Sequence, residues 1–119
     1  MDKNTKILLA DDSAFMRKIL KDILTEAGFS IFVEAENGNE ALEKYEAEKP
    51  GLILLDIIMP ELDGLGVVKK IGKEANIIII SAVGQDEMLK EAKDNGVKGY
   101  IVKPFDKEQV LKEVETALA

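Results

Sequence analysis

Short, continuous runs of apolar residues recur along the chain, and longer segments with helical spacing separate them. The apolar runs are Ile7–Ala10, Ile31–Val33, Leu52–Asp56, Ile77–Ser81 and Gly99–Val102. Most of these runs are continuous rather than alternating, which is typical of parallel strands buried on both faces of a sheet. They predict five strands.

The segments between the strands repeat apolar residues every three or four positions and predict five helices. These segments are residues 13–28, 39–50, 65–73, 86–96 and 106–119. Gly28 is expected to close the first helix as its C′ residue. Asp106 and Gln109 form a capping-box pattern at the start of the last helix. Segment 65–73 has the lowest helix propensity because it contains two glycines.

Strand and helix alternate five times, which predicts a single α/β domain over residues 1–119. The expected architecture is an open parallel sheet with helices on both faces and right-handed crossovers. Asn37-Gly38 is interpreted as a plain turn, Gly64 as a turn glycine, and Tyr45 and Phe105 as packing residues. In such sheets ligands bind outside the carboxyl ends of the strands.

Composition narrows the possible chemistry. The 119 residues include no cysteine and no histidine, which excludes thiolate sites, disulfides and the commonest zinc ligand. The net charge of −7 opposes binding to nucleic acid, so no nucleic-acid partner is expected. No apolar run approaches the roughly 20 residues that span a bilayer, and the N-terminus lacks the apolar core of a signal peptide. We therefore expect a cytoplasmic protein without a membrane partner.

Charged and hydroxyl side chains gather where the predicted strands end. Asp11 and Asp12 follow the first strand, Asp56 ends the third, Ser81 ends the fourth and Lys103 follows the fifth. If the first and third strands are neighbours, the three carboxylates repel one another by several kcal/mol. Magnesium, which prefers oxygen ligands, would relieve this repulsion. The sequence therefore predicts a Mg²⁺ site.

Each of these residues alone has an ordinary structural role as a cap, a turn residue or solvated surface. Their common position at one sheet edge favours a site for phosphoryl transfer. Asp56 would be the nucleophile, because carboxylates can form aspartyl-phosphates. Mg²⁺ and Lys103 would neutralise charge on the phosphoryl oxygens, and Ser81 could donate a hydrogen bond to one of them.

The segments "DDSAFMRKIL", "LILLDIIMPELDG", "SA" and "YIVKPF", in this order and spacing, resemble the receiver domain of two-component response regulators. The resemblance covers essentially the whole chain. A member of this family is a standard example of the flavodoxin-like doubly wound sheet, so the expected strand order 2-1-3-4-5 is taken from the resemblance.

The resemblance also implies roles for individual residues. Asp56 becomes the phosphoacceptor, and Ser81 and Tyr100 become a switch pair in which the aromatic ring follows the hydroxyl inward. Lys103 becomes the phosphoryl-binding lysine, and its bond to Pro104 is expected to be cis. The implied magnesium ligands are Asp11, Asp12, Asp56 and the backbone carbonyl of Ile58.

Within the family, "SAVGQDEMLKEA" followed by "GYIVKPF" is most similar to stand-alone chemotaxis regulators. This implies a monomer without an effector domain, a histidine kinase (CheA-like) as phosphodonor, and the flagellar motor switch protein or an archaeal adaptor as target. The switch catalyses only its own phosphorylation and dephosphorylation. The expected contact face combines the fourth helix, fifth strand and fifth helix, around Lys90, Lys98, Tyr100 and Lys107.

Two other functions share parts of this pattern. A phosphorelay intermediate, passing the phosphoryl group to a histidine phosphotransfer protein, would have the same site. A small flavodoxin-like binder or phosphatase would need a phosphate-cradling loop after the first strand, where "ADDSAF" places two carboxylates. Ile58 and Val83 occupy positions that influence phosphoryl lifetime in the family. Neither provides an amide or carboxylate, which suggests slow self-hydrolysis or another type of phosphatase.

Overall fold

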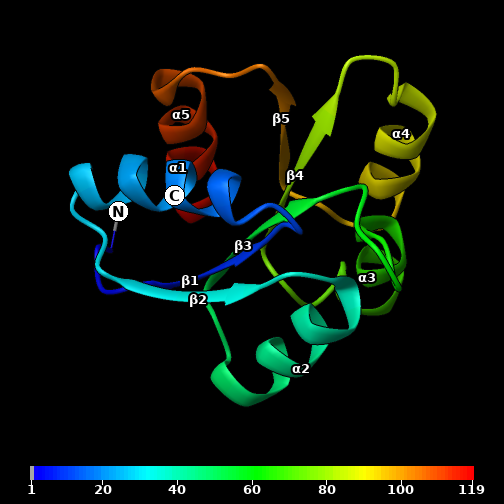
Figure 1. Ribbon diagram of the computed structural model, residues 1–119, viewed down its shortest axis with the longest axis horizontal. Coiled ribbons are helices and arrows are strands. Elements are labelled where there is room, and N and C mark those ends of the chain that lie inside the picture. Colours follow the sequence, from blue (N-terminus) through cyan, green and yellow to red (C-terminus); the bar gives the residue numbers. More distant parts are fainter. Residues whose placement is uncertain (1) are drawn as a thin grey trace.

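The computed structural model describes residues 2–119, in which strands and helices alternate along the chain (Figure 1). The strands are β1 (Lys6–Ala10), β2 (Ile31–Ala35), β3 (Leu52–Asp56), β4 (Ile77–Ala82) and β5 (Gly99–Lys103). The helices are α1 (Ala14–Glu26), α2 (Gly38–Glu48), α3 (Gly64–Ile71), α4 (Asp86–Asp94) and α5 (Lys107–Leu118). The predicted elements are confirmed, including the glycine-containing α3.

All five strands pair in parallel in the order β2-β1-β3-β4-β5, which confirms the flavodoxin-like α/β fold. β3 lies in the centre of the sheet and all five of its residues are buried. β2 lies at an edge and is mostly exposed or half-buried, and its ladder with β1 continues two residues beyond the predicted Val33, to Ala35. The edge strand therefore lacks the long apolar run that identified β3.

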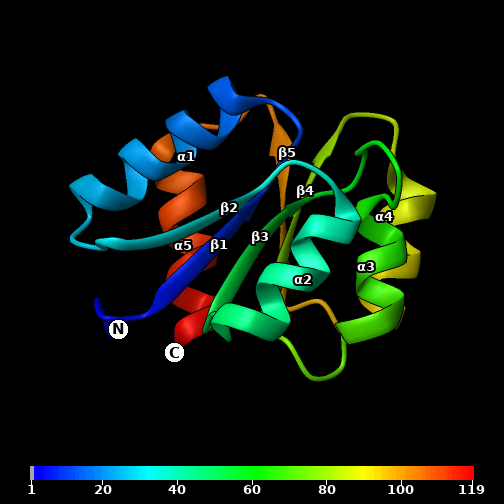
Figure 2. The same cartoon turned by 60° about the horizontal axis from the view of Figure 1, so that its bottom comes forward.

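Helices cover both faces of the sheet (Figure 2). Each face has its own hydrophobic core. α1 and α5 pack on one face, where Leu20, Leu24, Val110 and Val114 contribute to the core. The other three helices, α2, α3 and α4, pack on the opposite face. Because successive residues of a strand point to opposite faces, the apolar runs of the central strands supply both cores.

The predicted helix ends are confirmed where a specific side chain or backbone geometry defines them. Gly28 follows the C-cap of α1 with φ +108°, and its N–H donates to the Thr25 carbonyl at 3.0 Å. Asp106 and Gln109 exchange both bonds of the capping box at the start of α5. Tyr45 and Phe105 pack against the two cores, as expected.

Two interpretations of glycine were wrong. Asn37-Gly38 is the start of α2 rather than a plain turn: the Asn37 side chain accepts from the Glu40 N–H at 2.7 Å. Gly64 is the first residue of α3 rather than a turn residue, and the Asp63 side chain caps this helix. A Cβ atom at either glycine would overlap backbone atoms of another segment, at Leu62 for Gly38 and at Asp56 for Gly64. Close backbone approach, which the sequence does not display, explains both glycines.

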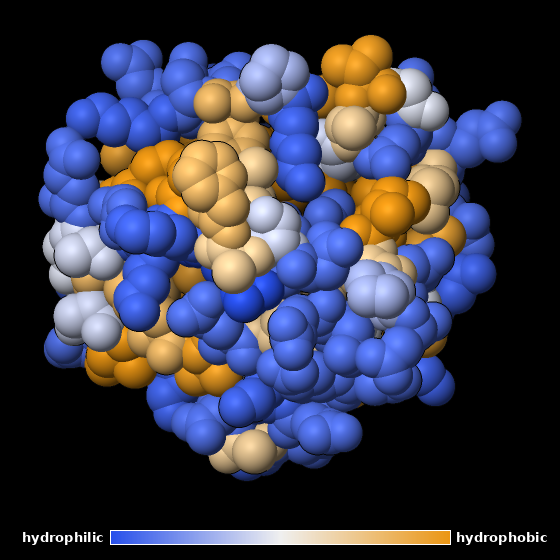
Figure 3. Space-filling model, viewed as in Figure 1, coloured by the Kyte–Doolittle hydropathy of each residue, from blue (hydrophilic) through white to orange (hydrophobic). Residues whose placement is uncertain are grey.

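No helix within residues 2–119 is long and apolar enough to cross a membrane. The view in Figure 3 shows a largely hydrophilic surface on which hydrophobic side chains form a few patches. The large apolar side chains that remain exposed are Phe15, Ile31, Ile58, Val83 and Tyr100. Phe15, in the first turn of α1, and Ile58 and Val83, in the loops after β3 and β4, all follow a strand within a few residues, so exposed apolar side chains occur at the carboxyl edge of the sheet.

Candidate functional site

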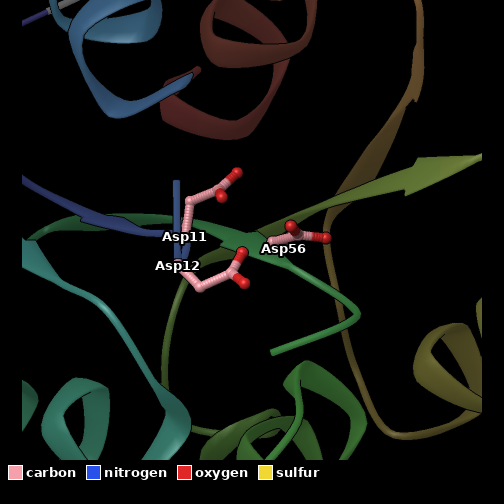
Figure 4. Close-up of side chains that lie close together, drawn as sticks. All are labelled: Asp11, Asp12 and Asp56. Carbon is pink, nitrogen blue, oxygen red and sulfur yellow. The ribbon is translucent and has the colours of Figure 1, made fainter. Parts of the chain in front are cut away.

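Three carboxylates meet at the carboxyl edge of the sheet, where β1 and β3 end side by side. The register pairs Ala10 with Leu55, which places the next residues along both strands next to each other. Asp11, Asp12 and Asp56 each offer a carboxylate oxygen, and these oxygens lie within 4.8 Å of one another (Figure 4). The structure therefore brings together the three acids predicted from the sequence.

Asp11 is the most constrained of the three acids. It is 1% exposed, and its N–H donates to the Ala35 carbonyl at 3.0 Å. Its Oδ1 accepts from the Ser13 N–H at 2.9 Å, whereas its Oδ2 has no hydrogen-bond partner. The nearest cation to Oδ2 is the Lys103 ammonium, at 3.8 Å. A buried carboxylate oxygen without a donor is a strong site for a cation.

The surroundings of Asp11 raise its pKa from 3.8 to about 6. Burial is the main cause, because it removes the charged form from water. The hydrogen bond from Ser13 lowers the pKa, Asp56 raises it, Lys103 lowers it and Asp12 raises it. The fold therefore keeps a carboxylate where its negative charge is unfavourable until a cation neutralises it.

Asp56 lies opposite Lys103, the last residue of β5. Asp56 is 6% exposed, and its Oδ2 accepts from the Lys103 ammonium at 3.3 Å. Its Oδ1 accepts from the Ile58 N–H at 3.2 Å. The bond between Lys103 and Pro104 is cis, as the resemblance implied. One carboxylate oxygen of Asp56 thus faces a point positive charge.

The donor set fits Mg²⁺. The three acids provide only oxygen atoms, which this hard cation prefers, and Asp12 is exposed to solvent, which can supply the waters that magnesium retains. The orphaned Oδ2 of Asp11 gains a partner when a cation binds. Histidine and cysteine, which favour zinc and other transition metals, are absent from the sequence. The chemistry of the acidic cluster therefore fits a magnesium site.

Ser81 and Tyr100 lie on the same face of the sheet, in the neighbouring strands β4 and β5. Ser81 is 2% exposed and follows Ile80, the register partner of Asp56. Tyr100 is 38% exposed, and the Lys93 ammonium of α4 lies 4.2 Å from its ring centre. Tyr100 pairs with Ile79, two residues before Ser81 in β4. Because alternate residues of a strand share a face, the hydroxyl and the ring are diagonal neighbours.

The lysines expected around Tyr100 do not all point the same way. Lys90 on α4 and Lys98 before β5 are exposed. The Lys107 ammonium instead pairs with Glu26 at the end of α1, at 3.0 Å. Lys107 thus faces the junction between α1 and α5, and Lys93 is the basic side chain that contacts the ring.

Sequence reasoning missed two polar side chains next to the site. Arg17, on α1, donates to the Asp11 carbonyl at 2.6 Å. Gln85 accepts from the Ala82 N–H at 2.6 Å, just beyond Ser81. Both contacts join a side chain to backbone, so residue type alone gives no signal for them. In the sequence, Arg17 is a basic helix residue like its neighbour Lys18, which forms a solvent-exposed ion pair with Asp22.

Comparison with known proteins agrees with this geometry. The model of the response regulator receiver domain family matches residues 7–115. The chain is 46% identical to the chemotaxis protein CheY of Bacillus subtilis over 116 residues, covering 95% of this chain and 97% of the relative. It is 48% identical to CheY of Thermotoga maritima over 109 residues, covering 89% and 91%.

A solved structure extends the similarity to the site. The crystal structure of the CheX-CheY-BeF3-Mg²⁺ complex from Borrelia burgdorferi contains a chain that is 36% identical, with a TM-score of 0.89. The match covers 97% of this chain and 90% of that one. That complex holds magnesium, the cation that the acidic cluster here fits.

Proposed function

The chain belongs to the response regulator receiver family, and from this premise we propose that it signals in chemotaxis by accepting a phosphoryl group on Asp56. Members of this family are phosphorylation switches rather than enzymes. The observation that carries the proposal is the position of Asp56, a nearly buried carboxylate between two further acids and the Lys103 ammonium. A structural aspartate would not need this surrounding charge.

Asp56 acts as the nucleophile toward a phosphohistidine of a CheA-like kinase. A carboxylate oxygen attacks phosphorus, so that an O–P bond forms while the P–N bond breaks, and the leaving imidazole nitrogen takes up a proton. Lys103 lies 3.3 Å from Asp56 Oδ2, where it can stabilise the phosphoryl oxygens. Mg²⁺, when held by Asp11, Asp12, Asp56 and the Ile58 carbonyl, supplies the remaining positive charge.

Ser81 and Tyr100 convert the phosphoryl group into a change of surface. The Ser81 hydroxyl moves to donate to a phosphoryl oxygen, and the Tyr100 ring turns into the space beside it. The ring leaves its contact with Lys93 when it turns. A shift from 1:99 to 99:1 in the active population needs about 5.5 kcal/mol of differential interaction. The new charge-assisted hydrogen bonds of the phosphoryl group can supply much of it.

The output partner contacts the face formed by α4, β5 and α5. This face carries the exposed Lys90, Lys93 and Lys98 around Tyr100. A surface hollow of about 270 Å³ adjoins Tyr100, with Gln109 and Lys112 of α5 among its lining residues. In chemotaxis the partner would be the flagellar motor switch protein or an archaeal adaptor. The basic side chains favour an acidic segment of that partner.

The chain acts as a monomeric receiver in the cytoplasm. It covers 97% of the Bacillus subtilis protein and 91% of the Thermotoga maritima protein, so the similarity to these chemotaxis proteins extends over nearly their whole length. Ile58 and Val83 give the phosphoryl group no amide or carboxylate neighbour, so its lifetime is set by slow hydrolysis or by a phosphatase. Ile58→Asn tests this point: an unchanged decay rate would remove any control by the side chain at position 58.

Intact-mass spectrometry after incubation with acetyl phosphate tests phosphorylation directly. We expect one phosphoryl adduct on the wild type in the presence of MgCl₂ and none when EDTA replaces the metal. Asp56→Asn keeps the size of the side chain but removes the nucleophile, so it should show no adduct. An adduct that persists in Asp56→Asn would move the phosphoacceptor elsewhere.

A folded control makes a negative result informative. Asp22→Asn changes an exposed acid that pairs with Lys18 on α1, and it should accept the phosphoryl group like the wild type. If the wild type shows no adduct although its circular dichroism spectrum is that of a folded α/β protein, the chain is a receiver that works by binding alone. The switch mechanism would then be wrong.

A further inference from the structure

The guanidinium of Arg17 links three elements beside the acidic cluster. Its Nη1 donates to the Asp11 carbonyl oxygen at 2.6 Å, and its Nε donates to Glu34 Oε1 on β2 at 2.8 Å. The Arg17 side chain is only 13% exposed. An arginine held at both ends of its guanidinium has a defined geometry, because the group is planar and its donors are fixed in direction.

The carbonyl that Arg17 holds belongs to the peptide unit between Asp11 and Asp12. This unit is planar, so a bond to its oxygen fixes the orientation of the whole plane and the direction in which the chain enters Asp12. Asp11 is already held by its bonds to Ala35 and Ser13. Asp12 is exposed, and its backbone orientation relative to Asp11 depends on that one peptide plane.

We propose that Arg17 is a positioning residue for the metal site, which it preorganises by holding the Asp11–Asp12 peptide. This inference rests on the proposed function, because it assumes that the two carboxylates bind Mg²⁺. Glu34 orients the guanidinium in turn. Outer groups that orient metal ligands commonly change metal affinity by 10- to 100-fold.

Electrostatics and positioning make opposite predictions at Arg17. A positive charge near a cation site repels the cation, so its removal alone should strengthen Mg²⁺ binding. Without the bond from Arg17 the Asp11–Asp12 peptide is no longer fixed, and this loss should weaken Mg²⁺ binding, because Asp12 must then be ordered when the cation binds. The direction of the change therefore separates the two effects. A merely structural link between α1 and the sheet would lower stability and leave the affinity of the folded protein unchanged.

The test is an NMR titration of the apo protein with MgCl₂, at constant ionic strength and about pH 7.5, so that Asp11 is ionised. Backbone amide shifts report the dissociation constant without any phosphorylation. We expect Arg17→Ala to raise the dissociation constant by about tenfold. Lys18→Ala is the matched control, because it removes a positive charge from the same turn of α1 without a contact to Asp11. Its affinity should equal that of the wild type or be slightly tighter.

Arg17→Lys keeps the charge and serves if the alanine variant does not fold. An ammonium cannot reproduce the two directed contacts, so its dissociation constant should lie between those of wild type and Arg17→Ala. Urea unfolding of each variant measures the stability change separately from metal affinity. Wild-type affinity in Arg17→Lys would show that the two directed contacts of the guanidinium are not needed for Mg²⁺ binding and would overturn the proposal.

Unchanged or tighter binding in folded Arg17→Ala would also overturn it. The wild type distinguishes this failure from a failure of the proposed function. If the wild type itself shows no saturable binding of MgCl₂, the magnesium site is wrong, and with it the premise. If the wild type binds Mg²⁺ and gains a phosphoryl group while Arg17→Ala binds equally well, only the positioning role is wrong.

Discussion

Leu52–Leu55 and Asp56 are consecutive in β3 and all are buried, yet their surroundings are opposite in kind. The four apolar residues divide between the two hydrophobic cores of the sheet, Ile53 and Leu55 in one and Leu52 and Leu54 in the other. Asp56 instead meets two more carboxylates and a lysine. The first region stabilises the fold through burial, whereas the second retains unfavourable charge that a ligand can relieve. Stability and function therefore separate within one strand.

Leu54→Ala should give the largest loss of stability, because it removes a fully buried side chain from the central strand. We expect the free energy of unfolding to fall by about 2–5 kcal/mol. Urea denaturation measures it. Phe15→Ala, at an exposed position on α1, is the control and should change stability by less than about 0.5 kcal/mol. Equal effects of the two variants would contradict the assignment of the core.

Gly64→Ala should lower the stability of the fold and also disturb the acidic site. Its Cβ would overlap the Asp56 carbonyl oxygen and the Ile57 backbone, neither of which can rotate away. Overpacking of this kind costs about 1–3 kcal/mol and should also displace Asp56, which lowers the yield of phosphoryl adduct in folded protein. Gly66→Ala is matched in helix and residue type but meets the flexible end of Leu62, so its cost should be smaller. A harmless Gly64→Ala would show that the loop can shift.

Asp11→Asn should raise the stability of the fold and abolish Mg²⁺ binding, which would separate the acidic cluster further from the stabilising core. At about pH 7.5, without Mg²⁺, it replaces an ionised buried acid beside Asp56 with a neutral group that can still accept from Ser13. Because the pKa of Asp11 is raised from 3.8 to about 6, we expect unfolding to cost about 3 kcal/mol more than in the wild type. Binding of MgCl₂ should be lost. A less stable Asp11→Asn variant would mean that the carboxylates do not oppose folding.

In the wild-type protein, stability and Mg²⁺ affinity should depend on pH in opposite directions. A raised pKa in the folded state means that the Asp11 carboxyl contributes stability below 3.8, and that this contribution is lost as the pH rises through about 6. Magnesium follows the opposite trend, since a proton competes for the carboxylate. We expect Mg²⁺ affinity to fall by up to about tenfold per unit below pH 6. A flat profile from pH 5 to about 7 in calorimetric titrations would exclude this competition.

The sequence alone determined the alternation of strands and helices along the chain, the buried centre of the sheet and the acids at its edge. These features follow from local periodicity and from the rule that the ends of parallel strands gather at one edge. The same rule placed Asp11, Asp12, Asp56, Ser81 and Lys103 together before any distance was known. The order of the strands in the sheet was taken from family resemblance, as was the assignment of Ser81 and Tyr100 as a switch pair, which remains a prediction.

Tertiary structure alone decided the contacts between a side chain or glycine and the backbone of a distant segment. At Gly38 and Gly64 the backbone of another segment occupies the space that a Cβ atom would need. Lys107 pairs with Glu26 on α1, and Arg17 donates to the Asp11 carbonyl. Every residue has the same backbone groups, so the sequence does not show which carbonyl a side chain will meet. Packing selects that partner, because only the folded chain brings the two segments within hydrogen-bonding distance.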